Sequence, residues 1–369
     1  MSTPSTDIDV AVIGAGVVGL ASAREIAIRG RSVCVIEAHP RPGMEASTHN
    51  SGVIHAGLYH PADSLKTTLA IEGRERLYAF CEQYGVPHRR TGKLIIAASP
   101  DESPALLALA ERARRNGVRD IEIVDAAAVR RLEPLVHAHT AMYSPSTGIL
   151  EAETYIRMLE RHCRECDVAL LYSTRLAAAE ARDDAVQLRT GREAIRAACV
   201  VNAAGLFADE VSHLFGRDAY RIYPCRGEYA ELLSRWTGTI SRPVYPLPHA
   251  SGHGLGVHLT PVIGGPIMLG PTIRYQDDKR DYERDRLPLE FFLDSTKPLL
   301  PSIGRDDVRL GGSGIRAKLH PPTESFADFL IERDAVVPRL VHAAGIDSPG
   351  LTASLAIARR VADLVEETV

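Results

Sequence analysis

Residues 8–19 read IDVAVIGAGVVG and combine an apolar strand pattern with a glycine-rich turn. The run over 8–13 suits a strand that is buried on both faces. A helix is expected from about 16 to 29, because Gly30 follows it and glycine commonly ends helices. A second apolar strand over 32–37 would complete a compact βαβ unit, which is typical of nucleotide-binding α/β domains.

Three glycines in this turn have separate physical roles. Gly14 permits the tight turn, Gly16 lets a pyrophosphate approach the backbone, and Gly19 lets the helix pack on the sheet. Glu37 ends the second strand, where a carboxylate can accept hydrogen bonds from ribose hydroxyls and disfavours a 2′-phosphate. The glycine motif alone is weak, but strand, helix, second strand and acid occur here in order. The expected cofactor contacts are Gly14, Ala15, Gly16, Val17, Val18, Gly19, Glu37 and Ala38.

The composition is that of an ordinary globular protein and excludes several functions. The 369 residues are 45% hydrophobic and 24% charged. The formal net charge of −4, without a basic tract that carries aromatics, predicts no nucleic-acid partner. Cys163 and Cys166 are the only close pair among six cysteines, and no second such pair follows. They are therefore interpreted as structural thiols, and no metal site is expected.

The apolar segment 10–23 resembles the core of a signal peptide. However, Asp7 and Asp9 precede it without any Lys or Arg, whereas an export signal needs a basic beginning. No apolar run reaches the length of about 18 residues that a transmembrane helix requires. The sequence therefore predicts no transmembrane segment and a cytoplasmic location, with peripheral contact at the inner membrane left open.

Later segments favour a ligand larger than NAD. Residues 46–59 form a dense polar cluster, and a strand ending at Gly205 and a glycine-rich loop over 345–352 follow far along the chain. Together these segments can wrap a long ligand from end to end. An ordinary polar turn is the plain alternative for the cluster. The flavin contacts expected from it are Ser47, Thr48, His49, Asn50, Ser51 and Gly52.

The strings THNSG at 48–52 and SPGLT at 348–352 resemble the D-amino-acid-oxidase-like (DAO) superfamily of FAD-dependent oxidoreductases, and particularly L-2-hydroxyglutarate dehydrogenases and oxidases. RGEY at 226–229 and GIR at 314–316 add less specific matches in the expected order. The resemblance implies FAD as the cofactor. It places the following residues beside the pyrophosphate or the flavin: Ala203, Ala204, Gly205, Gly314, Ser348, Pro349, Gly350, Leu351 and Thr352. Whether His49 carries the flavin covalently or orients its loop stays open.

The expected fold is α/β (α+β), with a Rossmann-like FAD-binding domain and an inserted substrate domain built on an antiparallel sheet. Frequent Pro and Gly among β-forming residues at 220–275 indicate that sheet. A terminal helix over about 350–367 is expected to return to the first domain. The domain boundaries are predicted as 1–85, 145–218 and 302–369 for the FAD-binding domain, and 86–144 and 219–301 for the substrate domain.

The resemblance implies oxidation of a small carboxylate substrate, preferably L-2-hydroxyglutarate to 2-oxoglutarate, by hydride transfer to flavin N5. Arg316 offers a planar fork for a carboxylate, although a surface ion pair is the plain alternative. His258 and His55 are candidate bases because histidine titrates near neutral pH, and His258 is narrowly preferred. Further pocket candidates are Tyr59, Arg226, Tyr229 and Thr260. The electron acceptor is left open as oxygen, a quinone or a carrier protein.

Three alternatives remain at this point. The same scaffold oxidises amines, such as glycine, sarcosine or D-amino acids, and also glycerol 3-phosphate. An amine oxidase has little need of a base, because a neutral amine can donate hydride directly. A flavin-binding sensor or assembly module without turnover is the alternative from another class.

Overall fold

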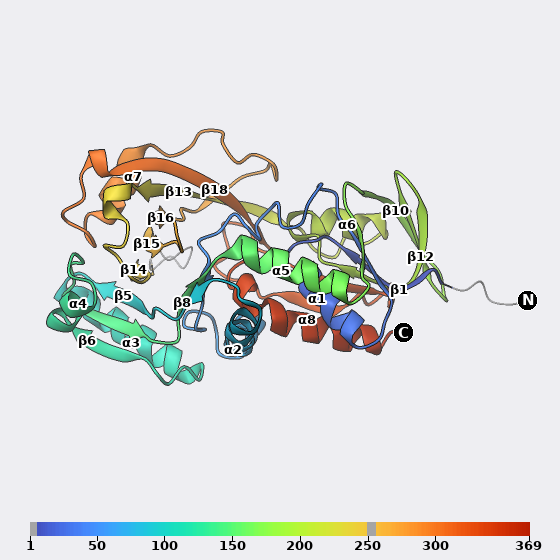
Figure 1. The fold of residues 1–369 in the computed structure, drawn as a ribbon, viewed down its shortest axis with the longest axis horizontal. Helices are drawn as coiled ribbons and strands as arrows, with labels where there is room; N and C mark the ends of the chain where they lie inside the picture. The colour runs from blue at the N-terminus through green and yellow to red at the C-terminus, as the bar shows by residue number, and fades with distance from the viewer. Residues whose placement is uncertain (1–5, 249–255) are drawn as a thin grey trace, which may run out of the picture.

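The computed structural model describes residues 6–248 and 256–369, which form two large sheets at opposite ends of an elongated molecule (Figure 1). The first sheet has the order β10-β11-β12-β1-β2-β9, and β20 and β19 extend it beyond β12. Its strands are β1 (Ile8–Ile13), β2 (Val33–Ile36), β9 (Ala169–Leu171), β10 (Leu176–Ala181), β11 (Val186–Thr190), β12 (Ala194–Asn202), β19 (Leu330–Arg333) and β20 (Leu340–Ala344).

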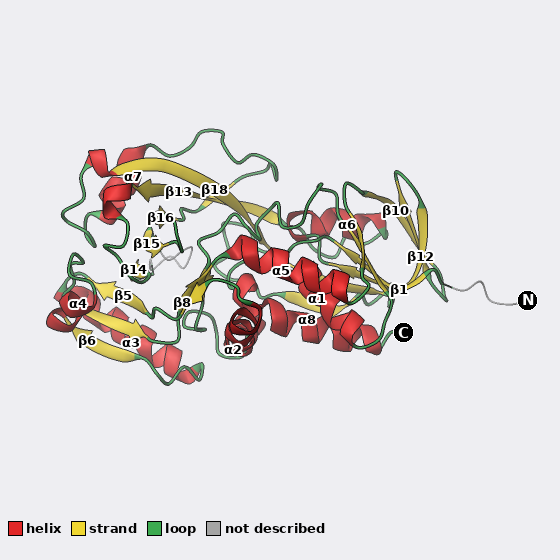
Figure 2. Cartoon of the chain, in the orientation of Figure 1, coloured by secondary structure: helices red, strands yellow, loops and turns green. Residues whose placement is uncertain are grey.

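The centre of this sheet is parallel, as a βαβ crossover requires. β1 pairs in parallel with both β2 and β12, and β12 pairs in parallel with β20. The helices that pack beside it are α1 (Val17–Ile28), α2 (Leu65–Tyr84), α5 (Ala152–Glu165) and α8 (Gly350–Glu366), whereas α6 (Ala208–Leu214) contacts β10 and β12 (Figure 2). The predicted βαβ unit and the α/β fold class are thus confirmed.

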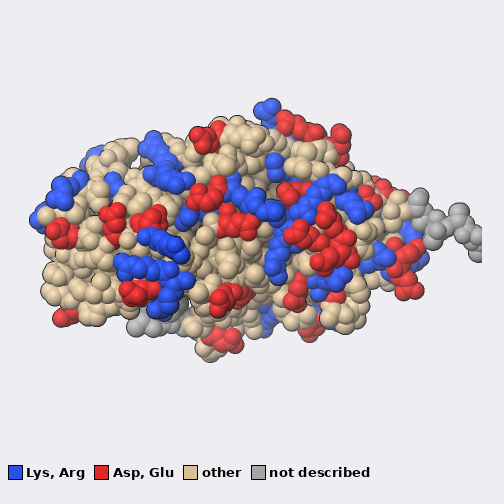
Figure 3. All heavy atoms as spheres, turned by 90° about the horizontal axis from the view of Figure 1, so that it is seen from below, with Lys and Arg blue, Asp and Glu red and all other residues tan. Residues whose placement is uncertain are grey.

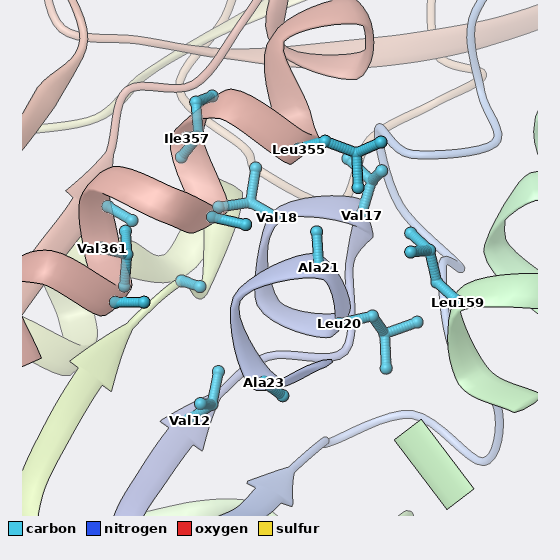
Figure 4. Close-up of a cluster of buried hydrophobic side chains, with 14 of the residues drawn as sticks. Val12, Val17, Val18, Leu20, Ala21, Ala23, Leu159, Leu355, Ile357 and Val361 are labelled. Atoms are coloured by element: carbon cyan, nitrogen blue, oxygen red, sulfur yellow. The ribbon is translucent and has the colours of Figure 1, made fainter. Parts of the chain in front are cut away.

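The core of this half lies between α1 and the terminal helix α8. Figure 4 shows Val17 and Val18 of α1 beside Leu355 and Ile357 of α8, and all four belong to one buried cluster. Each buried aliphatic side chain of this size contributes about 1.5–3 kcal/mol to stability. α8 also packs on α2 at close range, because a Cβ on Gly73 would lie 2.7 Å from the Cα of Ala353. The predicted return of the last helix to the first βαβ unit is confirmed.

The second sheet has nine strands in the order β17-β13-β16-β15-β14-β5-β7-β6, with β18 paired to β13. All its pairings are antiparallel except that of β14 with β5. Its strands are β5 (Lys93–Ala97), β6 (Glu122–Asp125), β7 (Thr140–Ser144), β13 (Tyr223–Leu232), β14 (Val244–Pro246), β15 (His258–Pro261), β16 (Ile267–Gly270), β17 (Arg274–Tyr275) and β18 (Val308–Lys318). Helices α3 (Ser103–Arg115), α4 (Ala126–Leu132) and α7 (Leu289–Thr296) flank it.

Two details differ from the expectations. β18 joins the substrate-side sheet, although its residues fall in the segment 302–369 assigned to the FAD-binding domain. The division into domains stays a prediction. A small third sheet of β3 (Val53–Ile54), β8 (Gly148–Leu150) and β4 (His88–Arg89) was not foreseen.

The surface carries both signs of charge. On the face seen in Figure 3, Lys and Arg side chains alternate with Asp and Glu side chains over most of the length of the molecule. Across residues 6–248 and 256–369, no helix combines the length and the apolar character that crossing a bilayer demands.

Candidate functional site

The glycine-rich turn forms one wall of a cavity of about 480 Å³. Gly14 has a φ of +102°, and a Cβ there would lie 2.6 Å from the carbonyl oxygen of Ala203. A Cβ on Gly19 would lie 1.9 Å from the carbonyl oxygen of Gly14, so any side chain would separate α1 from the turn. The predicted contacts that line this cavity are Gly14, Gly16, Val17, Val18, Glu37, Ala38, Ser47, Ala203, Ala204 and Gly205.

Glu37 is held rigidly at the end of β2. One carboxylate oxygen accepts a hydrogen bond from the N–H of Ala15 at 2.6 Å, and the other accepts one from the N–H of His39 at 2.7 Å. The carboxylate lines the cavity beside the turn, which is the position that a ribose needs. Ala15 and Gly19 do not line the cavity themselves; they shape the turn that does.

A second cavity, of about 540 Å³, continues from the first. Both are lined by Val17, Ala46, Ser47, Ala317 and Ile346. At this junction, the N–H of Val17 donates to Oγ of Ser47 at 2.9 Å, which fixes the hydroxyl at the N-terminus of α1. Helix N-termini favour phosphate groups. The joined cavities therefore suit a long ligand whose phosphates lie at α1 and whose ends reach both sheets.

Most residues expected beside the flavin line the second cavity. They are His49, Asn50, Ser51, Gly52, Gly314, Ser348, Pro349, Gly350 and Leu351. Gly314 is needed there, because a Cβ would lie 2.1 Å from the carbonyl oxygen of His49. Thr48 and Thr352 line neither cavity: Thr48 donates to the carbonyl oxygen of Gly43, and Thr352 accepts from the N–H of His55. These two residues brace the loops instead.

The structure brings five of the predicted substrate-site residues together in this cavity: His55, Tyr59, Tyr229, His258 and Arg316. They come from the loop before α2 and from β13, β15 and β18. The two sheets thus contribute to one site, with the glycine-rich turn at its far end.

The expectation for Arg226 is wrong. Side chains alternate along a strand, so Gly227 and Tyr229 of β13 face the cavity whereas Arg226 points to the other side. Arg226 is buried there, pairs with Glu228 at 3.0 Å, and donates to the carbonyl oxygen of Arg284 at 2.6 Å. Gly227 is the functional position of this motif, because a Cβ would lie 2.9 Å from the guanidinium nitrogens of Arg316.

Thr260 does not line the cavity either. It lies two residues beyond His258 on β15 and is fully buried beneath the cavity wall. Its expected role in substrate binding is therefore not supported by its position.

Arg316 is the basic group best placed to receive a carboxylate. Its Nη1 donates to the carbonyl oxygen of Thr272 at 3.2 Å, and no carboxylate among the described residues forms an ion pair with it. Gly227 gives the guanidinium room at the cavity surface. A planar guanidinium that is left without an acidic partner can bind a ligand carboxylate through two hydrogen bonds.

Positive charge predominates around this cavity. Its described lining includes the four basic side chains of Lys66, Arg112, Arg316 and Lys318, but only one acidic side chain, that of Asp347. Asp347 bridges Lys66 at 2.7 Å and Lys318 at 3.3 Å. Burial would raise the pKa of Asp347, but the two ammonium groups outweigh it and lower the pKa to about 2. The cavity is therefore suited to an anion.

The two histidines have different environments. Burial, reinforced by the charge of Lys93 and by His60, lowers the pKa of His55 to about 3, so its imidazole is neutral at ordinary pH. The imidazole of His258 stacks on the phenol ring of Tyr245 with ring centroids 3.5 Å apart. An imidazole with so low a pKa accepts a proton poorly, so His55 suits a positioning role. His258 is therefore the better candidate for a base.

Five further residues in or beneath the wall of this cavity belong to none of the sequence motifs: Lys93, Lys66, Lys318, Tyr245 and Asp347. Lys93 is the first residue of the fully buried strand KLIIA, and a lysine inside an apolar strand was a usable signal. The Lys66–Asp347 pair joins residues 281 positions apart, and no local pattern indicates it.

The cysteines take no part in this site. Cys163 is buried, and its thiol donates to the carbonyl oxygen of Leu20. Over 6–248 and 256–369, no cluster of three or more His, Cys, Asp or Glu side chains is arranged to hold a metal ion.

The comparisons with known proteins agree with this geometry. The family described as FAD dependent oxidoreductase (DAO) matches residues 9–364. The L-2-hydroxyglutarate dehydrogenase of Arabidopsis thaliana mitochondria is 34% identical over 96% of this chain and 83% of its own length. Among solved structures, the L-alpha-glycerophosphate oxidase of Mycoplasma pneumoniae with FAD bound is 25% identical, has a TM-score of 0.89, and covers 97% of this chain and 94% of its own.

A third similar protein, the glycine oxidase of Geobacillus kaustophilus, has a TM-score of 0.85 and covers 99% of this chain and 96% of its own. At 22% identity it shows the fold alone. FAD fits the glycine-rich turn, Glu37 and the continuous cavity. It is also the cofactor named in the description of the matching family. The chain belongs to the DAO family of FAD-dependent oxidoreductases.

Proposed function

We propose that this enzyme oxidises L-2-hydroxyglutarate to 2-oxoglutarate. The observation that carries the proposal is the excess of basic side chains in the cavity, where Asp347 is the one acidic side chain against four Lys or Arg residues in the described lining. Arg316 alone is enough to balance the charge of a monocarboxylate substrate. A dicarboxylate has a second negative charge, which the other basic side chains of the cavity can balance. The name of the Arabidopsis relative supports the same substrate.

In this proposal, Arg316 binds the carboxylate next to the reacting carbon through its planar fork. His258 takes the proton of the substrate hydroxyl, and the hydrogen on the same carbon leaves as hydride while the C=O bond forms. FAD, when bound, supplies the acceptor for those two electrons. His55 positions the loop at the N-terminus of α8, because its backbone N–H donates to Oγ1 of Thr352. Its imidazole remains neutral and lies with Nε2 3.4 Å from Oγ of Ser348.

The expected contacts of Tyr59 and Tyr229 with the substrate stay within this proposal. Both line the cavity, and Tyr229 lies on the same face of β13 as Gly227. A phenol hydroxyl can donate to a carboxylate without adding charge to the site.

Glycerol 3-phosphate is the second candidate substrate. It carries an oxidisable hydroxyl and a phosphate, which the basic cavity also suits, and the glycerophosphate oxidase of Mycoplasma pneumoniae shares the fold over 97% of this chain. Glycine and the neutral D-amino acids have only one carboxylate and carry an ammonium group. The basic cavity therefore disfavours them relative to the two dianions.

The test is a substrate screen that follows bleaching of the oxidised flavin band in the absence of oxygen. L-2-Hydroxyglutarate should bleach it fastest, and the D-enantiomer, glycerol 3-phosphate, glycine and D-amino acids serve as comparisons. Faster bleaching by glycerol 3-phosphate would reassign the substrate. A flavin that stays oxidised with every compound would favour a binding module without turnover.

The acceptor and the compartment are also proposals. Oxygen, a quinone and a carrier protein are distinguished by adding each to the reduced enzyme and following the return of the oxidised flavin band. We propose a cytoplasmic location, with peripheral contact at the inner membrane as the alternative, and cell fractionation distinguishes the two. The name of the Arabidopsis relative assigns that protein to mitochondria, so the fractionation includes an organelle fraction.

A further inference from the structure

Lys93 is a fully buried lysine beneath the wall of the catalytic cavity. It is the first residue of β5, and its side chain has no solvent exposure. Its ammonium nitrogen lies 3.1 Å from the phenol oxygen of Tyr59, and it lies 4.7 Å and 4.5 Å from the ring centroids of Tyr59 and Tyr245. Tyr59 and Tyr245 both line the cavity, whereas Lys93 does not.

No ionic partner for protonated Lys93 lies in the part of the chain that the structure describes. Among residues 6–248 and 256–369, no carboxylate forms an ion pair with it. A buried charge without an ionic partner costs several kcal/mol, and aromatic faces recover only part of that cost. A lysine kept only for structure would be better replaced by an apolar side chain. The burial of Lys93 therefore indicates that its side chain has a function beyond holding the fold together.

The hydrogen bond to Tyr59 has a fixed direction while Lys93 is protonated. The ammonium group then has only donors, so the phenol oxygen of Tyr59 accepts from Lys93. The hydrogen of the Tyr59 hydroxyl then has to point elsewhere. Because Tyr59 lines the same cavity as Arg316 and His258, that hydrogen is available to an oxygen atom of a ligand in the cavity.

We propose that Lys93 is a positioning residue that holds the Tyr59 hydroxyl as a hydrogen-bond donor to the anionic substrate. Its charge also polarises the Tyr59 O–H, which strengthens donation to a carboxylate. The same ammonium lies over the ring of Tyr245, on which His258 stacks, so one cation supports two parts of the cavity wall. This inference rests on the proposed function, because it requires an anionic substrate.

The test is made at pH 6, where Lys93 is protonated, and uses the FAD-loaded enzyme and the variants Lys93→Met, Lys93→Arg, Tyr59→Phe and the double variant Lys93→Met/Tyr59→Phe. The Kd of glutarate, a dicarboxylate without an oxidisable hydroxyl, is measured from the perturbation of the flavin absorption band. The kcat and KM of L-2-hydroxyglutarate are measured in parallel. Lys297→Met serves as the matched control, because Lys297 is exposed on the other side of the substrate sheet and forms its ion pair with Asp294.

Lys93→Met and Tyr59→Phe should each weaken glutarate binding roughly 10-fold, which is the usual effect of losing one hydrogen bond to a charged ligand. The double variant should bind no more weakly than Tyr59→Phe, because Lys93 acts through Tyr59. KM should rise more than kcat falls, and Lys93→Arg should restore part of the affinity. The control should bind glutarate like the wild type.

Two results would overturn the inference: unchanged glutarate binding in Lys93→Met, or losses that multiply in the double variant. If Lys93→Met fails to fold, the same double-mutant cycle is measured with Lys93→Arg, Tyr59→Phe and the variant that combines them. Failure of the proposed function is recognised separately, because the wild type would then prefer another compound in the screen. If that compound is an anion, the cycle is repeated on its kcat/KM; if it is uncharged, both proposals fail.

Discussion

The imidazole of His258 lies parallel to the phenol ring of Tyr245, with ring centroids 3.5 Å apart and an angle of 8° between the planes. The stack covers one face of the imidazole. Both residues line the cavity with Arg316. The orientation of the ring is therefore set by packing before any substrate arrives.

Replacement of His258 by Gln should lower kcat for L-2-hydroxyglutarate by about 10²–10⁴-fold, the usual contribution of a general base. FAD content should be unchanged, because His258 lies on the substrate sheet. His139→Gln is the control, since His139 is exposed. Near-normal turnover of the hydroxy acid by the His258 variant would remove His258 from the mechanism and favour amine oxidation, which hardly needs a base.

Arg316→Met should lower kcat/KM by about 10²–10³-fold, because loss of one partner of a desolvated charge pair costs about 2–5 kcal/mol. Arg309→Met is a matched control on the same strand: Arg309 is exposed and pairs with Glu231. Steady-state kinetics of both variants give the comparison. Equal losses in the two would mean that the effect comes from β18 as a whole rather than from the guanidinium in the cavity.

Glu37→Gln should weaken FAD binding by about 10-fold. The amide keeps one acceptor oxygen, so either the N–H of Ala15 or that of His39 loses its hydrogen bond, at a cost of about 1–3 kcal/mol. Titration of the apoprotein with FAD, followed by flavin fluorescence, measures the change. Glu25→Gln, on the exposed side of α1, should leave FAD affinity unaltered; unaltered affinity in Glu37→Gln as well would exclude the assigned role.

Asp347 links the stability of the protein to acid pH. Its pKa in the folded protein is about 2, below the ordinary 3.8, so its stabilising contribution is complete above pH 4 and is lost as the pH falls toward 2. The shift corresponds to about 2 kcal/mol. Asp347→Asn should lower Tm at pH 7, and its difference from the wild type should shrink between pH 4 and pH 2. Thermal unfolding across this range tests the sign.

Lys93 should lower the stability of the folded protein, whereas Asp347 raises it. Burial lowers its pKa from 10.5 to about 7, and the titratable groups that face it are Tyr59, Tyr245 and His55. The folded state resists protonation, so the cost is complete below pH 7 and is relieved as the pH rises toward 10.5. Lys93→Met should therefore raise Tm at pH 6, by about 2 °C or more, and this gain should fade by pH 10. A lower Tm at pH 6 would indicate a structural lysine.

Local patterns explain which parts of the site could be predicted. The glycine turn and Glu37 belong to one βαβ unit, where spacing along the chain fixes position in space. The error at Arg226 has a different origin: a strand pattern shows that side chains alternate, but only the neighbouring strand β18 decides which face meets the cavity. Lys93 and Asp347 acquire their roles from residues far away in sequence, and composition carries no sign of those contacts.

The packing of α8 on α1 has a consequence for biosynthesis. α1 ends at Ile28, yet the helix that covers it spans Gly350–Glu366 and is therefore synthesised much later. At roughly 5–20 residues per second, the apolar face of α1 waits from about twenty seconds to about a minute for its partner. The apolar face of α1 is therefore open to aggregation during that interval, and the pocket can retain its flavin only after α8 has been translated.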